Sequence, residues 1–253
     1  RARISETPEA RPPPRAHRVG VRVHPEPGPA EEASMTATAA SRFTEQLDLI
    51  VRSRYPLLYV VTHEEGRLEG LLRDLARRHG KPLFTWAATT GLAGGSPANG
   101  ALALRYPTPA EVLERIRSQE GSGIFLLRDL HAHFDDPLVV RRLRDLASGL
   151  ADTHRTVIVS SPKLALPPEL EKDVTVLDLP LPEPDELRAA MRALLVQLHE
   201  GKPEAVQIAR DDVEAFVRAA QGLTLVEAES AFARAAVSGG ALRTEDVAVV
   251  MEE

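Results

Sequence analysis

The pattern of apolar and polar positions predicts a parallel sheet covered by helices. From Phe43 onward, segments with apolar residues at helical spacing alternate with short continuous apolar runs. Such runs are typical of strands that are buried on both faces, as in parallel sheets. We therefore predict an α/β fold with three layers and five parallel strands. The predicted strands span residues 57–62, 82–87, 124–128, 156–160 and 174–177.

Helix starts are clearly marked between these strands. Thr108-Pro109-Ala110-Glu111 supplies a capping residue, a proline at the first helical position and a glutamate three residues after the cap. Asp136-Pro137 repeats the first two of these features. We therefore expect a helix to begin at each of these two points.

A small helical domain is predicted at the end of the chain. The strand pattern stops at Pro184, and Thr224 with Glu227 three residues later predicts another capping box. Leu225, Ala228, Phe232 and Ala235 then fall on one helix face. The predicted helices span residues 184–199, 211–220, 225–237 and 244–252.

The first residues have a different composition. Residues 1–42 are rich in proline, arginine and alanine and hold few apolar side chains, so we predict a disordered extension. Met35 is the only plausible start codon near the first structured segment, which leaves residues 1–34 as an upstream extension or a flexible tail. The expected division is therefore 1–42 disordered, 43–182 α/β and 183–253 helical.

Composition and charge exclude several classes of function. The 253 residues carry a formal net charge of -6, which argues against a general nucleic-acid binder. The absence of cysteine excludes disulfides and thiolate metal sites and agrees with a cytoplasmic protein. No apolar stretch approaches the roughly 18 residues that cross a bilayer, so no membrane partner is expected.

The end of the first strand lacks a phosphate-binding loop. His63-Glu64-Glu65-Gly66-Arg67 follows the strand, where a Walker A turn needs Gly, four residues and Gly-Lys-Ser/Thr. The third strand ends in Asp129, as a Walker B strand does, but Leu130 follows in place of a second carboxylate. The chain therefore keeps a possible magnesium ligand and lacks the loop, its lysine and the glutamate that would activate water.

Candidate site residues lie at the carboxyl ends of the strands, where sites gather in such sheets. Glu64 and Glu65 are expected in a first helical turn, where acids favour the helix dipole. Asp129 is either a magnesium ligand or an acceptor for loop amides, and the second role is favoured without a phosphate loop. The full set of candidates is His63, Glu64, Glu65, Asp129, His131, Ser160 and Ser161.

Three further features are weaker candidates. His131 and His133, with the acids that follow them, could hold zinc, but Asp136 already has a capping role. The glycine-rich run of residues 91–100 has no lysine and no Gly-x-Gly-x-x-Gly spacing, so we predict a solvent loop. Ser160 and Ser161 do not lie in a Gly-x-Ser-x-Gly elbow, which argues against a serine hydrolase.

Four segments resemble the amino-terminal half of an AAA-family ATPase of the kind found in cyanobacteria, plastid genomes and other bacteria. They are residues 52–65, 135–143, 168–172 and 222–229, and the resemblance extends over about 43–253. It implies an AAA+ sheet of order 5-1-4-3-2 and a helical lid. It also implies that an intact ATPase module, using ATP and magnesium, follows this degenerate one.

The resemblance transfers little of the catalytic machinery to this chain. Asp129 matches the Walker B aspartate, and Ser160 or Ser161 falls at the polar sensor after the fourth strand. Residues 169–174 lie where arginine fingers are expected and contain no arginine. The lid helix start matches Gly222, Thr224 and Glu227. We therefore expect no cofactor in this segment and no ATP hydrolysis by this segment alone.

Three functional hypotheses follow. The leading one is an interaction module that docks an unidentified protein partner or helps copies of itself form a ring around the following module. The second is an ATPase domain that uses a composite site. The third is a receiver-like phosphoacceptor at Asp129, which lacks the expected lysine, because Asp178 and Pro180 stand after the fifth strand. A receiver would place strand 124–128 beside 57–62, whereas an AAA+ sheet places 156–160 there.

Overall fold

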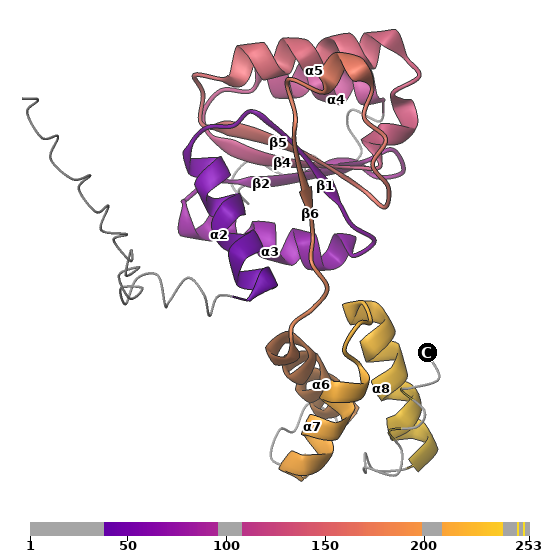
Figure 1. Ribbon diagram of the computed structural model, residues 1–253. Helices are drawn as coiled ribbons and strands as arrows, with labels where there is room; N and C mark the ends of the chain where they lie inside the picture. The colour runs from indigo at the N-terminus through magenta and orange to yellow at the C-terminus, as the bar shows by residue number, and fades with distance from the viewer. Residues whose placement is uncertain (1–37, 96–107, 199–208, 240–246, 248–249, 251–253) are drawn as a thin grey trace, which may run out of the picture. The chain divides into compact units, whose positions relative to one another are not determined.

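The computed structural model describes residues 38–95, 108–198, 209–239, 247 and 250. Figure 1 shows the sheet with its helices and the helical segment that follows β6. The elements are α2 (Ala39–Arg52), β1 (Leu57–Val61), α3 (Glu65–Arg78), β2 (Leu83–Ala87), β3 (Gly91–Gly94), α4 (Pro109–Ser118), β4 (Gly123–Arg128), η2 (Leu130–His133), α5 (Pro137–Leu150), β5 (Arg155–Ser161), η3 (Pro168–Leu170), β6 (Thr175–Asp178), α6 (Pro184–Leu198), α7 (Arg210–Ala219) and α8 (Leu225–Gly239).

The sheet has six strands in the order β3-β2-β4-β5-β1-β6. The predicted strands correspond to β1, β2, β4, β5 and β6, which are parallel neighbours, whereas β3 pairs antiparallel with β2. The prediction of a five-stranded, wholly parallel sheet is therefore wrong. The sheet holds one more strand, β3, at its edge beside β2. The fold class, α/β, is confirmed.

The extra strand comes from the segment that was predicted to be a solvent loop. After β2 the chain reverses in a tight turn, with the Thr90 amide donating to the Ala87 carbonyl at 3.1 Å. Leu92 is then only 1% exposed, and Gly94 lies opposite Phe84 with φ of 104°. This backbone conformation favours glycine, so a glycine-rich run forms a paired edge strand here. Residues 96–100 of the predicted loop lie outside the described part.

Strand neighbours exclude the receiver-like alternative. β1 pairs with β5, with Leu57 opposite Val157, and with β6 on its other side. β4 pairs with β2 and β5 instead of β1. The receiver hypothesis required β4 next to β1 and is therefore wrong.

The sheet is buried on both faces. Alternate residues of β1 pack into the cores on opposite faces of the sheet. Tyr59 lies in the core that α4 and α5 cover, and Leu58 lies in the core that α2 and α3 cover. Within the described part of the chain, no helix has the length and apolarity that crossing a bilayer requires.

The predicted helix starts before α4 and α5 are confirmed. The Thr108 hydroxyl accepts from the Glu111 amide, and the Glu111 carboxylate accepts from the Thr108 amide, which completes a capping box. The Asp136 carboxylate accepts from the Leu138 amide at 2.8 Å. These local contacts fix where the two helices begin over their face of the sheet.

Helices α6, α7 and α8 share an apolar core of their own. Phe216 and Phe232 meet edge to face at its centre, with ring centroids 6.2 Å apart, and Ala228 and Ala235 are fully buried beside them. Of the predicted helix 244–252, only Val247 and Val250 lie within the described residues, both helical. At the other end, α2 begins at Ala39, inside the segment predicted to be disordered, and residues 1–37 are outside the described part.

Candidate functional site

The connection from β1 to α3 is only three residues long. The Thr62 amide donates to the Ser161 carbonyl at 2.8 Å, and the Thr62 hydroxyl accepts from the Glu64 amide at 2.9 Å. These bonds turn the chain directly into α3. The strand is therefore joined to the helix by a tight polar turn.

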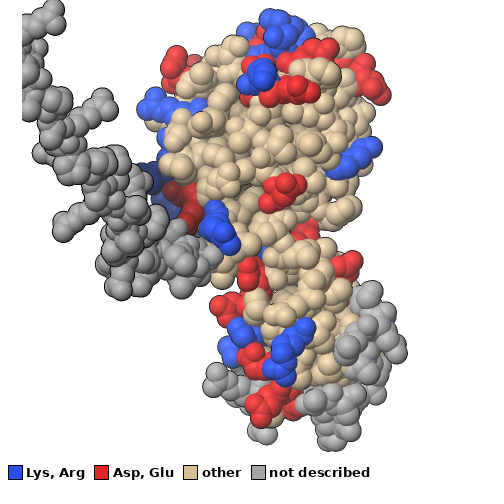
Figure 2. All heavy atoms as spheres, viewed as in Figure 1, with Lys and Arg blue, Asp and Glu red and all other residues tan. Residues whose placement is uncertain are grey.

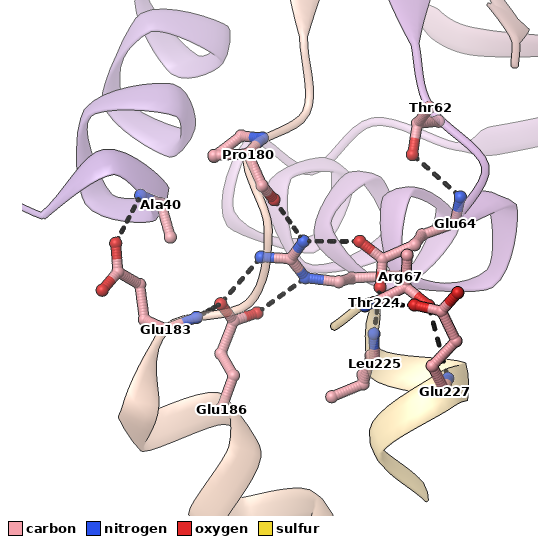
Figure 3. A network of polar contacts seen from close by, with 10 residues as sticks. All are labelled: Ala40, Thr62, Glu64, Arg67, Pro180, Glu183, Glu186, Thr224, Leu225 and Glu227. Atoms are coloured by element: carbon pink, nitrogen blue, oxygen red, sulfur yellow. Dashed lines mark hydrogen bonds and ion pairs between the residues drawn. The ribbon is translucent and has the colours of Figure 1, made fainter. Parts of the chain in front are cut away.

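Glu64 lies at this turn and is almost completely buried, at 5% exposed. One carboxylate oxygen accepts from the Leu225 amide at 2.6 Å, and the other accepts from the Arg67 guanidinium at 3.0 Å (Figure 3). Leu225 is the first residue of α8, where backbone amides lack helical partners and the dipole favours an anion. Glu64 directly precedes the first turn of α3, which holds Glu65, and its side chain makes no capping bond to that helix.

Arg67 joins this carboxylate to a second one. Its guanidinium donates two hydrogen bonds to Glu186, at 2.9 and 2.8 Å, and another to the Pro180 carbonyl. The side chain of Arg67 is 5% exposed. Burial lowers the pKa of Arg67, but the hydrogen bonds and charges of Glu186 and Glu64 raise it by more. Arg67 is therefore a permanent buried cation between two carboxylates.

The second carboxylate belongs to the first turn of α6. Glu186 is 32% exposed and also accepts from the Glu183 amide at 3.1 Å. The Glu183 carboxylate in turn accepts from the Ala39 amide, at the start of α2. The polar network therefore ties the connector after β6, and the first turns of α6 and α8, to helices on the sheet.

This edge of the sheet is where α/β folds hold phosphate at a helix N-terminus. Here the buried Glu64 carboxylate follows the strand, bonded to Arg67 and the Leu225 amide, and residues 62–68 include no lysine. A triphosphate placed there would face a buried negative charge. The turn after β1 therefore offers neither the glycine loop nor the lysine of a Walker A turn.

The other predicted acids point elsewhere. Glu65 lies 3.8 Å from Arg128, which also pairs with Glu69 of α3. Asp129 has a left-handed backbone, with φ of 53°, and its side chain is 57% exposed. It makes no side-chain capping bond to the 3-10 helix that follows, and its predicted role as an acceptor for loop amides stays a prediction. Leu130 turns inward instead and is fully buried.

The two histidines do not form a metal centre. His131 Nδ1 lies 3.6 Å from an Asp129 oxygen and has no hydrogen-bond partner, whereas His133 packs edge-on against Trp86 with ring centroids 6.4 Å apart. Among the residues that the structure describes, no group of three or more His, Asp or Glu side chains is arranged to hold a metal.

The two serines after β5 are enclosed. Both are 0% exposed, and the Ser160 hydroxyl has no hydrogen-bond partner. The Ser161 hydroxyl donates to the Lys163 carbonyl at 2.9 Å and so closes the turn that leaves the strand. Neither hydroxyl is positioned to reach a ligand outside the core.

The predicted lid helix start lies beside Glu64. Gly222 has φ of 100°, and the Glu227 carboxylate accepts from the Thr224 amide at 2.8 Å. The Thr224 amide and hydroxyl lower the pKa of the Glu227 carboxyl. The structure thus brings two predicted groups together, Glu64 and the start of α8. The sequence interpretation missed Arg67 and Glu186, which join them.

Two family models match this chain. The model described as "SpoVK-like AAA ATPase, N-terminal domain" matches residues 43–179, and that described as "SpoVK-like AAA ATPase, second domain" matches residues 185–253. The chain belongs to the SpoVK-like AAA ATPases. The resemblance seen in the sequence is thereby confirmed at the level of the family.

Curated relatives of this SpoVK-like chain include the uncharacterized AAA domain-containing proteins ycf46 of two algae. The protein of Guillardia theta is 26% identical over 213 residues, and that of Trieres chinensis is 26% identical over 214 residues. These alignments cover 83% and 84% of this chain but 40% and 41% of the relatives. The chain thus spans about two fifths of their length.

Solved structures show the same fold. Domain III of the Thermotoga maritima replication initiation protein DnaA superposes with a TM-score of 0.52 at 12% identity, covering 85% of this chain and 92% of that one. A chain from the HORMA:CdnC:Trip13 complex of E. coli MS115-1 gives 0.55 at 13% identity, covering 84% and 86%. At these identities the likeness concerns the fold alone.

Proposed function

We propose that this SpoVK-like chain is an AAA+ module that does not hydrolyse ATP and serves assembly, regulation or partner docking for an active ATPase module in the same protein. One observation supports this above all others. The buried Glu64 carboxylate follows β1, where a Walker A loop would begin, and it is paired with Arg67 and the first amide of α8.

The missing chemistry supports the same proposal. Phosphoryl transfer is catalysed by charge stabilisation and positioning, which require a cation on the terminal phosphates, a magnesium ligand and a group that orients water. Arg67 is already bound to two carboxylates, and Leu130 stands where the second Walker B acid would be. AAA ATPases in general use ATP and magnesium, and we assign that use to the other module.

The surface charge supports a protein partner. On the face seen in Figure 2, acidic and basic side chains lie next to each other and no extended basic patch is visible. Exposed pairs such as Arg117 with Glu114 and Arg141 with Asp145 neutralise each other. We propose that the partners are the following module, further copies of this chain in a ring, or an unidentified protein, all in the cytoplasm.

An ATPase domain with a composite site is the second candidate. It is favoured by the exposed carboxylate of Asp129 at the end of β4, which is accessible to a magnesium ion. In this arrangement the missing cation would come from a neighbouring subunit. The helical lid would then close on nucleotide rather than on Glu64.

Calorimetric titration of the chain with ATP and ADP, with and without magnesium, tests the proposal. We expect no saturable heat and no phosphate release above a buffer blank. Saturable binding accompanied by magnesium-dependent turnover would refute the proposal and favour the composite site. The same assay is then repeated with the remainder of the protein added as a separate chain. Phosphate release that requires both chains would mean that one supplies groups that the other lacks, whereas unchanged release would mean that one chain is active alone.

A further inference from the structure

The groups around Glu64 are those that proteins use to bind an external anion. Arg67 supplies a planar guanidinium, and α8, a helix of 15 residues, supplies the amide of its first residue. A guanidinium and a helix N-terminus together recognise phosphate and carboxylate groups. In this chain, however, the anion is a side chain of the protein.

We propose that Glu64 is a built-in anion that occupies this site permanently and fixes the helical segment to the sheet without nucleotide. The inference deepens the proposed function and rests on it only in assuming that no nucleotide competes for the site. Its ligand chemistry is that of a small oxyanion, carboxylate or phosphate. The site becomes open to such an anion from solution only when the Glu64 carboxylate is removed.

The contacts divide the attachment into two parts. Glu64 holds the start of α8 through the Leu225 amide, at 2.6 Å. Arg67 holds the start of α6 through Glu186 and the connector through Pro180. Because Arg67 touches both carboxylates, it joins the two attachments (Figure 3). Loss of Glu64 alone should therefore free the first turn of α8 from the sheet, while α6 stays attached and the rest of α8 stays packed against it.

Burial makes this occupancy tight. The side chains of Glu64 and Arg67 are each 5% exposed, so their charges are poorly screened by salt. Removing the carboxylate leaves a desolvated guanidinium with one partner fewer and an unsatisfied helix amide. Both groups would then favour any small anion that fits the vacated space.

The test is chemical rescue of the Glu64→Ala chain. We expect amide hydrogen exchange of residues 224–226 to become about tenfold faster than in the unaltered chain, because the start of α8 loses its anchor. Sodium formate or inorganic phosphate, titrated against sodium chloride at constant ionic strength, should slow this exchange saturably and raise the thermal midpoint. The unaltered chain should respond to neither anion.

Two matched variants keep the result interpretable. Glu114→Ala removes a carboxylate from an exposed pair with Arg117 and should show no anion rescue. If Glu64→Ala does not fold, Glu64→Gln serves in its place: the amide fills the space without the charge, so exchange at 224–226 should rise without rescue.

Two outcomes overturn the built-in anion. One is exchange at the start of α8 that stays unchanged in both Glu64 variants. The other is a destabilised Glu64→Ala chain that neither formate nor phosphate restores. Nucleotide turnover by the unaltered chain would instead refute the proposed function, so the two failures are distinguishable.

Discussion

Replacing Arg67 with methionine tests whether the polar network holds this module together. Methionine retains the length and much of the apolar volume of the side chain but removes the charge and all its donors. Four hydrogen bonds are lost, two to Glu186, one to Glu64 and one to the Pro180 carbonyl. The structural consequence is a buried carboxylate without its cation.

The size of the effect follows from which groups are left unpaired. Removing one member of a buried ion pair costs about 3–5 kcal/mol. Glu186 is 32% exposed and can be hydrated, whereas Glu64 is 5% exposed and cannot. We therefore expect the lower end of that range, about 3 kcal/mol. Adding Glu64→Gln to Arg67→Met removes the unpaired charge and should recover about 1–2 kcal/mol.

Urea unfolding at pH 7 measures both effects. Trp86 is the only tryptophan and lies in β2 at 1% exposed, so its fluorescence reports the sheet, while far-ultraviolet circular dichroism also reports α6–α8. Arg117→Met, at an exposed pair, is the control and should leave the midpoint unchanged. An Arg67→Met chain that unfolds like the unaltered chain, or a further loss of stability when Glu64→Gln is added, would contradict this role of Arg67.

Three further predictions concern the sheet and its helices. A hydrogen bond from His79 lowers the pKa of Asp48 below its ordinary value of 3.8. The ionised Asp48 carboxylate therefore stabilises the fold fully above pH 3.8, and this contribution is lost as the pH falls through the lower pKa of the folded state. The difference in unfolding free energy between Asp48→Asn and the unaltered chain should shrink between pH 6 and 3. Gly94→Ala should destabilise the fold by about 1–3 kcal/mol in thermal melts, because its φ of 104° is strained for alanine and the new methyl group would collide with a carbonyl of β2. Gly70→Ala, with open space around it in α3, should instead stabilise the fold by up to about 1 kcal/mol. Tyr59→Phe should cost about 1–3 kcal/mol in urea unfolding, because the hydroxyl donates to a carbonyl at 2.7 Å and accepts from an amide at 3.3 Å in the turn after β5; unchanged stability would mean that water replaces it.

The parallel strands could be predicted because each is encoded by its own residues. A continuous apolar run such as Ile124–Leu127 has no alternative to burial on both faces, and its ends are marked by polar residues. The caps at Thr108 and Asp136 are equally local, since the donor lies two or three residues from the acceptor. β3 escaped prediction because its glycines carry no apolar alternation, and pairing with β2 decided its conformation.

The site could be predicted only in part, because its contacts are distant in the sequence. Glu64 was a candidate through its place after β1, but its partner Leu225 is 161 residues away. Arg67 and Glu186 are 119 residues apart, and each occupies a helical position that is equally compatible with a solvated surface. The burial of Glu64 and Arg67 depends on contacts with α6 and α8, which no local pattern contains. Only the spacing of Glu64 and Arg67, one helical turn, gave a local indication of their pairing.

A built-in anion changes what the helical segment can do. For a lid that closes on an external ligand, the fraction of closed molecules depends on the concentration of that ligand. An anchor formed by the protein's own side chain is present at an effectively constant concentration, so the anchored fraction does not vary in this way. Under the proposed function, the start of α8 is then held in one arrangement whether the proposed ATPase module is loaded or empty. A surface that does not respond to nucleotide suits an assembly or docking role, because a partner bound to it is retained through each cycle of hydrolysis elsewhere. The same permanence makes Glu64, rather than Asp129, the residue on which the proposed function depends.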